Sequence, residues 1–548
     1  MPDLLLAAIG YGGYISIIKF IIFLVMFFGW LPLLTWVFED AKAIETKEVF
    51  WTGVVLGAGA AGTIIWLVTP VFFAGMLIYL IVVGATSLAY VKHRNSLVMD
   101  FDKVLTVDHI KNLLVSKEKK LTELKSCTFI SANRNEIPIP EPRTPDFFGY
   151  KTTYEILSDA LWRRASSIAF SPTPQDYKVA YYVDGAVLQQ PSTGIEQMKY
   201  FIRFVKQLAD LDIKEKRKPQ KGTFKVARGE NYTEWEVTTA GSTAGEQVRL
   251  KQITHEDLPR LNEIGLMPEQ YEQLRRFNEI KQGVFIISGP SKSGITTTLY
   301  AFLRNHDAFI NHINTLERQA SYNIPNITQN AFNLSDTGTT TFAKKLQALV
   351  RMGPDVVGVG ECEDAESAQV ACKAAADGKL MYVTLKADSV IQAFAKWLKF
   401  VGDRNLAAGT LLGISNQRLL RKLCDECKQA YTPDKELFKK FNINAEKTKV
   451  LYRAGKVLYD KRGKASTCEK CQGTGHFGRM GVFEIITLNN ELRKALIQMR
   501  SLPEIGTQFR RAKMLYLQEQ ALRRVISGTV TINEMIRVLS RPKTKKPT

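Results

Sequence analysis

The sequence predicts an α/β protein with a phosphate-loop core, an N-terminal membrane anchor and a metal-binding element made of four cysteines. Three observations support this fold class: two long uncharged runs before residue 95, a strand–glycine loop–helix pattern that begins at Gly283, and two Cys-x-x-Cys pairs after residue 420. A chain of 548 residues allows three or four domains. Its 45% hydrophobic and 23% charged residues are typical of compact folded domains.

The first uncharged run extends from Phe20 to Phe38, between Lys19 and Glu39. As a helix, it is long enough to cross a hydrocarbon core of about 30 Å. A signal peptide is the alternative, but it would need an early basic segment and a small-residue cleavage site, and neither is clear in this sequence.

The second run, from Val49 to Val91, is long enough for two crossings with a reversal at Pro70. Its first half is rich in glycine and alanine, which let membrane helices pack closely. A buried helical hairpin in a soluble domain is the alternative, although uncharged runs of this length are rare there. Lys92 and Arg94 follow the last crossing, so we expect residues 1–95 to form an anchor of about three helices and the remaining chain to lie in the cytoplasm.

The net charge of +20 suits an anionic partner such as a membrane surface, a nucleic acid or an acidic protein. A generally basic, soluble surface accounts for the charge equally well. Because no stacked-aromatic or groove-reading motif accompanies it, we do not expect a nucleic-acid partner.

Residues 96–150 are expected to form a polar helix, from Asp108 to Lys125, and an extended linker with four prolines. Residues 151–255 combine strand-like runs with an amphipathic helix from Gln197 to Leu211, and therefore predict a small α+β domain. A further helix is expected from Leu258 to Ile280.

A phosphate-loop pattern follows. The apolar run from Gly283 to Ser288 reads as a buried strand, and the next ten residues, Gly289-Pro-Ser-Lys-Ser-Gly-Ile-Thr-Thr-Thr298, lead into an apolar helix. The expected motif is GxxxxGK[ST], and Gly289, Gly294 and Thr296 fit it.

The lysine position of this motif holds Ile295. That lysine is the cation that reaches the β- and γ-phosphates, and a hydrogen bond to a charged group contributes about 1.5–3 kcal/mol that isoleucine cannot supply. Lys292 could act as a displaced cation, but we expect its side chain to extend into solvent.

With the segments that follow, the chain resembles the ATPases of type II secretion and type IV pilus assembly. The family's acidic box, Thr-Ile-Glu-Asp-Pro, corresponds to Thr315-Leu-Glu-Arg-Gln319. Its Walker B-like box corresponds to Gly360-Glu-Cys-Glu-Asp364, its histidine box to Thr384-Leu-Lys-Ala-Asp388, and a nearly intact segment runs from Gln417 to Cys427. The resemblance covers about residues 150–540, and the three-helix anchor is not part of the usual family pattern.

The resemblance implies a RecA-like ATPase-type domain at residues 256–420, preceded by a PAS-like regulatory domain at residues 151–255. It implies a hexamer with nucleotide between subunits, and Glu317 and Glu361 as residues that could still polarise a water. The residues expected to contact nucleotide are Gly289, Ser293, Gly294, Thr296 and Thr297.

Five residues of the family pattern are replaced, at Ile295, Glu236, Arg318, Glu363 and Lys386. Phosphoryl transfer depends on positioning and on cations that offset developing negative charge. Glutamate at positions 236 and 363 is expected to add negative charge near phosphates. We therefore predict weak or absent hydrolysis, so that Glu317 and Glu361 are vestigial, and we do not expect firm binding of ATP and Mg²⁺. The alternative is a slow ATPase that uses Lys292 or Lys386.

The four paired cysteines, Cys424, Cys427, Cys468 and Cys471, predict a zinc-binding element at residues 421–485. Four thiolates fill a tetrahedral site, so the expected zinc is structural. The alternative is four unliganded cysteines, and His476 is expected to be a loop residue rather than a fifth ligand. Residues 486–548 are expected to form a C-terminal helical domain with a basic tail.

Two hypotheses follow from these observations. The first is a pseudo-ATPase in the inner membrane that acts as a scaffold, a regulatory subunit or a non-catalytic member of a mixed hexamer with an active homologue. Its partners would be inner-membrane components of a secretion or pilus machine. The second is an active motor of unusual chemistry. A DNA-associated membrane protein is a third class, supported by the net charge alone.

Overall fold

The computed structural model describes residues 17–44, 46–98, 103–105, 127–141, 144–229, 231–253, 258–332, 341–444, 446, 448–455, 457–459, 465–498 and 501–540. They belong to two compact units, Met1–Val183 with Val187–Thr254, and Asp184–Ala186 with His255–Thr548. The helix expected from Asp108 to Lys125 and the basic tail after Ser540 lie outside the described residues.

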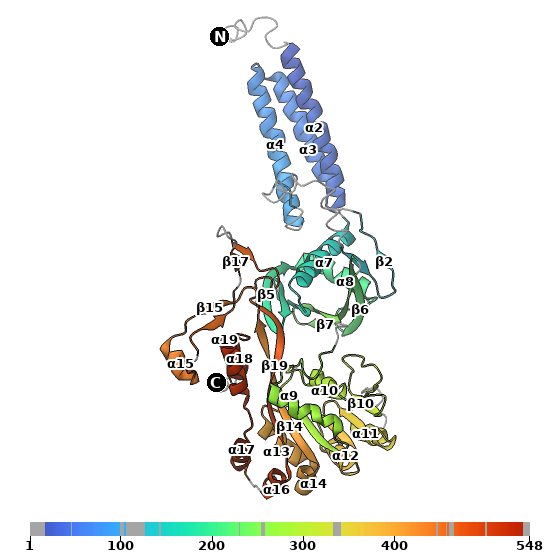
Figure 1. Ribbon diagram of the computed structural model, residues 1–548. Coiled ribbons are helices and arrows are strands. Elements are labelled where there is room, and N and C mark those ends of the chain that lie inside the picture. The colour runs from blue at the N-terminus through green and yellow to red at the C-terminus, as the bar shows by residue number, and fades with distance from the viewer. Residues whose placement is uncertain are drawn as a thin grey trace, which may run out of the picture. The chain divides into compact units, whose positions relative to one another are not determined.

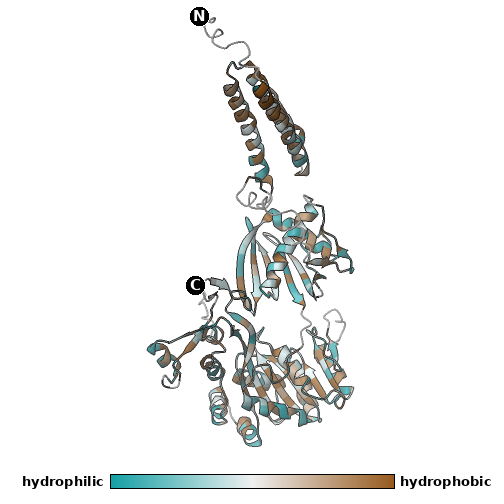
Figure 2. Cartoon of the chain, turned by 45° about the horizontal axis from the view of Figure 1, so that its top comes forward, coloured by the Kyte–Doolittle hydropathy of each residue, from teal (hydrophilic) through white to brown (hydrophobic). Residues whose placement is uncertain are grey.

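The first unit begins with three apolar helices, α2 (Ile17–Ala43), α3 (Glu48–Val68) and α4 (Phe72–Leu97) (Figure 1). Each is long and apolar enough to cross a membrane, and Figure 2 shows apolar residues along most of their length. The chain reverses between α3 and α4 at Pro70, where Thr69 is extended, as a residue before proline tends to be. The three expected helices are therefore present, and their crossing of a membrane stays a prediction.

Small residues let these helices approach closely. A Cβ atom at Gly59 would lie 2.1 Å from the Trp30 ring, and one at Gly75 would lie 2.5 Å from the Trp66 ring. Both glycines are thus required by the large rings that pack on them, because any side chain would displace a ring.

A buried ion pair joins α2 to α4. Arg94 Nε lies 2.7 Å from Asp40 Oδ2, and the two side chains are 3% and 1% exposed. The Tyr90 hydroxyl donates a second hydrogen bond to the same oxygen at 2.7 Å. A charge buried to this degree needs such a partner, so the pair fixes which faces of the two helices meet.

The α+β part of this unit is an eight-stranded sheet with the order β2-β1-β6-β7-β8-β3-β4-β5. Its strands are β1 (Thr128–Ile130), β2 (Glu136–Ile137), β3 (Ser167–Pro172), β4 (Asp176–Val183), β5 (Ala186–Gly194), β6 (Gln220–Arg228), β7 (Asn231–Ser242) and β8 (Gly245–Ile253). The helices α7 (Pro145–Trp162) and α8 (Ile195–Leu208) pack together and bury their apolar faces in its core. The sheet takes in strands before residue 151, because β1 pairs with β6.

The second unit contains a seven-stranded sheet with the order β11-β10-β12-β13-β9-β14-β19. Its strands are β9 (Gly283–Gly289), β10 (Ile313–Glu317), β11 (Thr328–Ala331), β12 (Val356–Val359), β13 (Leu380–Lys386), β14 (Leu411–Leu423) and β19 (His476–Thr487). The first six strands in this order are parallel, and β19 is antiparallel to β14. The helices that follow its strands are α10 (Ile295–Leu303), α11 (Phe342–Arg351), α12 (Ala365–Ala376), α13 (Val390–Val401) and α14 (Arg404–Gly409).

The helix expected from Leu258 to Ile280 is shorter than predicted, so this expectation was wrong in extent. The helix α9 spans Pro268–Arg275 and is followed by a 3₁₀ turn at Arg276–Glu279. Gly265 has a φ of +104°, and its Cα packs against the backbone of Gly481. A left-handed glycine ends helical continuity, and Pro268 then provides a favoured first helical position.

The C-terminal part of the second unit carries the cysteine element and four helices. The element contains two short antiparallel pairs and a helix: β15 (Gln429–Tyr431) with β16 (Leu451–Arg453), β17 (Val457–Tyr459) with β18 (Ala465–Thr467), and α15 (Lys435–Phe441). The helices are α16 (Asn490–Gln498), α17 (Leu502–Arg511), α18 (Leu517–Ile526) and α19 (Ile532–Leu539). The element lies in the chain between β14 and β19, which are neighbouring strands of the large sheet.

Candidate functional site

The phosphate-loop pattern and the three acidic or histidine boxes meet at one edge of the large sheet. The strands β9, β10, β12 and β13 end at Gly289, Glu317, Val359 and Lys386, where the loop and the boxes begin or lie. Because these strands are parallel, their carboxyl ends lie at the same edge. Ligands of open α/β sheets bind at this edge, so it is the candidate functional site.

Two glycines and Ser293 shape the loop between β9 and α10. Gly294 has a φ of +87° and caps the N-terminus of α10, a conformation that favours glycine. The buried Ser293 hydroxyl lies against Gly289, where a Cβ atom would be 2.2 Å from Ser293 Oγ. Gln417 Nε2 donates to the Ser293 carbonyl at 2.9 Å. The half-buried Thr296 and Thr297 lie in the first turn of α10.

Ile295, at the lysine position of the motif, supplies no cation to the loop. Ile295 is half-buried and packs against the apolar core that includes Leu299. Lys292 is exposed and has a φ of +65°. The loop therefore has the amides and hydroxyls of a phosphate site without the lysine that reaches the phosphates, and the residues present fit a nucleotide incompletely.

Glu317 is held inside the protein by neighbouring hydroxyls. It is 4% exposed. The Tyr300 hydroxyl donates to its Oε2 at 2.5 Å, and the Thr315 hydroxyl donates to its Oε1 at 2.9 Å. Burial and the bond to Glu317 raise the pKa of Tyr300, so the phenol stays a donor. Glu317 is therefore enclosed by protein donors, and the family motif did not indicate Tyr300 as its partner.

Three charged residues that depart from the family pattern meet in one network with Glu361, which we call the charge network. Arg318 Nε lies 3.2 Å from Glu361 Oε2, and Arg318 Nη2 lies 3.0 Å from Glu363 Oε2. Lys386 Nζ lies 2.7 Å from Glu363 Oε1. The hydrogen bond between Lys386 and Glu363 lowers the pKa of Glu363 and raises that of Lys386, so both groups of this pair are charged at neutral pH.

The charge network corrects the expectation that Glu363 adds uncompensated negative charge near phosphates. The acid of the family's acidic box has become Arg318, and the arginine of its Walker B-like box has become Glu363, so the two replacements have opposite signs and contact each other. Glu236 is also paired, because Lys221 Nζ lies 2.8 Å from its Oε2. The opposite signs of the two replacements were the sequence signal that could have predicted this pairing.

The remaining acidic residues of the Walker B-like box have structural contacts. Glu361 has a φ of +59°, and its amide donates to the Thr384 hydroxyl at 2.6 Å. Asp364 caps α12, since its carboxylate accepts hydrogen bonds from the amide and the hydroxyl of Ser367, both at 2.7 Å. Such a cap stabilises the helix and does not require a nucleotide.

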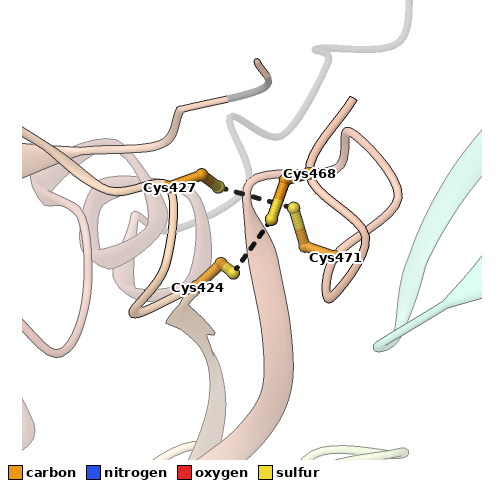
Figure 3. Close-up of side chains that lie close together, drawn as sticks. All are labelled: Cys424, Cys427, Cys468 and Cys471. Atoms are coloured by element: carbon orange, nitrogen blue, oxygen red, sulfur yellow. Dashed lines mark hydrogen bonds between the residues drawn. The ribbon is translucent and has the colours of Figure 1, made fainter. Parts of the chain in front are cut away.

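The four cysteines form a closed cluster (Figure 3). All four are buried, and their sulfur atoms lie within 4.8 Å of one another. Cys424 Sγ is 3.8 Å from Cys468 Sγ, and Cys427 Sγ is 3.5 Å from Cys471 Sγ. In tetrahedral zinc sites the Zn–S bond is about 2.3 Å, which separates the sulfurs by just under 4 Å, and four thiolates complete the coordination.

The donor set and the backbone around the cysteines fit structural zinc. The Gly475 amide donates to Cys471 Sγ at 3.3 Å, as expected for the second sphere of a thiolate. Gly455 touches the Cys427 carbonyl so closely that a Cβ atom would lie 1.7 Å from that oxygen. His476 lies outside the four-residue cluster, with its Nδ1 3.0 Å from the Thr474 carbonyl.

Comparisons with known proteins agree with this architecture. The family described as type II/IV secretion system protein matches residues 149–537, and the chain belongs to this family. It is 28% identical over 403 residues to the type IV pilus assembly ATPase PilB of Thermus thermophilus. The aligned region covers 73% of this chain and 44% of that protein. It is 30% identical over 387 residues to the type II secretion system ATPase E of Vibrio cholerae, which covers 70% of this chain and 74% of that protein.

Solved structures show the same fold. The ATPase DotB of Legionella pneumophila superposes with a TM-score of 0.51 at 15% identity, over 72% of this chain and 96% of that one. The predicted α/β secretion-ATPase fold is thus confirmed. The chain spans less than half of the pilus ATPase that it matches and about three quarters of the secretion ATPase.

Proposed function

We propose that this chain is a non-hydrolysing member of the secretion-ATPase family that acts as a membrane-anchored scaffold or regulatory subunit of a type II secretion or type IV pilus machine. The observation that carries this proposal is the charge network. At the edge where a nucleotide would need cations, Arg318 and Lys386 are already neutralised by Glu361 and Glu363.

The chemistry of phosphoryl transfer supports this reading. Catalysis requires cations that are placed against the developing charge of the γ-phosphate. Ile295 contributes none, and Lys386 donates to Glu363 at 2.7 Å. A triphosphate would have to compete with carboxylates for these cations, so ground-state binding and turnover both lose stabilisation.

The two residues kept from the family as candidate acids are vestigial in this proposal. Both carboxylate oxygens of Glu317 accept hydrogen bonds from Tyr300 and Thr315. Glu361 is bound to Arg318. Glu317 is buried, and Glu361, although 45% exposed, is held by Arg318. Gly289, Ser293, Gly294, Thr296 and Thr297 are proposed as the remains of a nucleotide loop.

The scaffold role rests on the parts of the chain that remain intact. We infer that α2, α3 and α4 cross the inner membrane and that the large C-terminal part lies in the cytoplasm, following the basic residues after Val91. Cys424, Cys427, Cys468 and Cys471 would hold structural zinc. Such a subunit could join a hexamer or a mixed hexamer with an active homologue and contact inner-membrane components of the machine.

Phosphate release by the full-length protein in detergent tests this proposal. We expect no release above background from the natural chain and none from Ile295→Lys, because the lysine alone leaves the charge network intact. An active family member run in parallel controls the assay. Release that disappears in Lys292→Ala or Lys386→Ala would instead establish a slow motor with a relocated lysine.

A further inference from the structure

A pocket of about 370 Å³ lies next to the cysteine element in the second unit. Its walls come from β14, β15, β16, β19 and the N-terminal half of α19. None of its lining residues belongs to the phosphate loop or to the charge network. The residues that give the pocket its chemistry are Arg421, Arg453, Arg537, Glu534, Tyr431 and Tyr452.

Glu534 organises two of the arginines. It is 1% exposed, and its carboxylate accepts hydrogen bonds from Arg421 Nη2 at 2.8 Å and from Arg537 Nη2 at 2.6 Å. The Arg421 amide and the Nε atoms of both arginines donate to the same carboxylate. Burial alone would raise the pKa of Glu534, but the hydrogen bonds from Arg537 and Arg421 lower it to about 2. The acid is thus ionised and fully used as an acceptor.

The pocket keeps a surplus of positive charge. Three guanidinium groups face one carboxylate, so the charged lining carries two net positive charges. Among the described residues, Arg421 Nη1 and Arg537 Nη1 donate to no other group, and Arg453 donates only from Nε, to Gln429 Oε1 at 3.3 Å. These unused donors are arranged for an acceptor that the chain itself does not provide.

The N-terminus of α19 adds to this field. Thr531 is its cap and accepts from the Glu534 amide at 3.0 Å, and Ile532 and Asn533, the first two residues of the helix, line the pocket. The first amides of a helix have no intrahelical acceptor, and they carry the positive end of the helix dipole. A helix terminus together with arginines is the arrangement that binds phosphate groups.

One tyrosine ring lies on the same face of the paired strands β15 and β16 as Arg453. Tyr431 is opposite Leu451, and Arg453 is opposite Gln429, so both side chains project from one face of the pair. Tyr452, which is opposite Ala430, projects from the other face, where its ring packs on Gly528. Tyr431 therefore offers an aromatic ring beside Arg453.

We propose that this pocket binds a small organic phosphate, with the phosphate at Arg453, Arg537 and the N-terminus of α19 and the organic group against Tyr431. Such a ligand would connect β16 of the cysteine element to α19. This site is separate from the phosphate loop and does not depend on whether the loop binds nucleotide.

Titration calorimetry of the full chain in detergent tests the proposal with three probes: inorganic phosphate, guanosine 5′-monophosphate and uncharged guanosine. We expect the monophosphate to bind more tightly than phosphate, and guanosine to bind without measurable heat. Arg453→Ala should raise the Kd of the monophosphate about 10-fold or more, because one charge-assisted contact is lost. Arg453 is exposed and makes one hydrogen bond, so this variant should fold.

Two controls identify the site. Arg510→Ala removes an exposed arginine of α17 outside the pocket, and Lys292→Ala alters the phosphate loop, so both should leave the Kd unchanged. Arg537→Gln should weaken binding as Arg453→Ala does. If no phosphate probe binds, or if both arginine variants of the pocket bind as the natural chain does, the proposal is wrong.

The soluble headgroup of phosphatidylglycerol, glycerophosphoglycerol, distinguishes the source of the phosphate without involving the apolar helices. If the headgroup does not bind while the soluble monophosphate binds in a way that depends on Arg453, the ligand is a soluble metabolite. If the headgroup binds, loses affinity in Arg453→Ala and is displaced by excess monophosphate, the same phosphate chemistry is supplied by a lipid headgroup.

Discussion

Exchanging the charges of Arg318 and Glu363 measures the contact on which the charge network depends. In the natural chain and in the double exchange, Arg318→Glu with Glu363→Arg, this pair has opposite charges. In each single exchange it has like charges. Contacts with Glu361 and Lys386 change in both single variants and cancel in the double-mutant cycle to first order.

The structure sets the expected magnitude. Arg318 and Glu363 are each 41% exposed and lie 3.0 Å apart, which is typical of a surface ion pair. Such a pair contributes about 0.2–1 kcal/mol. We take the interaction energy of the pair as −E in the natural chain and in the double exchange, and as +E in each single exchange. The coupling free energy of the cycle is then four times E, or about 1–4 kcal/mol.

The four proteins of the cycle are compared by thermal unfolding of the full chain in detergent. The measurement is made at low salt and at about 0.5 M salt, where charges are strongly screened. We expect each single exchange to lower the unfolding temperature, the double exchange to recover part of the loss, and salt to reduce the coupling. Pairing Arg318→Glu with Glu366→Arg, an exposed site on α12, should give additive effects. Additivity of the Arg318 and Glu363 exchanges within about 0.3 kcal/mol at low salt would refute the network.

Three further predictions concern other parts of the chain. Metal analysis should find one zinc per chain, and Cys471→Ser should lower the zinc content and reduce the unfolding temperature by about 10 °C. Burial lowers the pKa of His306 to about 4, so this side chain takes up a proton more readily in the unfolded chain. The free energy of unfolding should therefore fall by about 2 kcal/mol from pH 7 to pH 5. Denaturant unfolding at both pH values should show a smaller fall in His306→Gln. Asp40→Asn should cost about 3–5 kcal/mol by removing the buried negative charge that Arg94 Nε contacts, whereas Glu39→Gln should have little effect on the unfolding temperature.

Much of the fold could be predicted from the sequence because its signals are local. Uncharged runs indicated α2, α3 and α4, and the order of strand, glycine loop and helix indicated β9 and α10. The cysteine spacing predicted the cluster that the structure forms. In each case neighbouring residues in the chain carry the pattern, so no knowledge of distant contacts was needed.

The arrangement of the candidate site could not be predicted in the same way. Arg318 and Glu363 follow β10 and β12, and Lys386 is the last residue of β13, so their contact depends on the parallel register of these three strands. Likewise, the Tyr300 hydroxyl on α10 donates to Glu317, the last residue of β10, 17 residues later in the chain. Taken one at a time, these residues read as separate losses, whereas their positions in space show mutual compensation.

The extent of two segments was also set by contacts that the sequence does not display. The α+β sheet begins at β1 because Phe129 pairs with Val226, nearly 100 residues later in the chain. The helix before β9 begins only at Pro268, because Gly265 packs against Gly481 in a left-handed conformation. Both contacts join segments far apart in the sequence, so local periodicity could not place these boundaries.

Calorimetric titration of the full-length protein with Mg²⁺ and ATP tests the central claim most directly, with an active family member as the reference. The account predicts no saturable binding at ATP concentrations that saturate the reference, because Ile295 replaces the phosphate-binding lysine and Glu363 retains Lys386. Saturable binding of similar affinity, accompanied by phosphate release that Lys292→Ala or Lys386→Ala abolishes, would contradict it and identify a working motor.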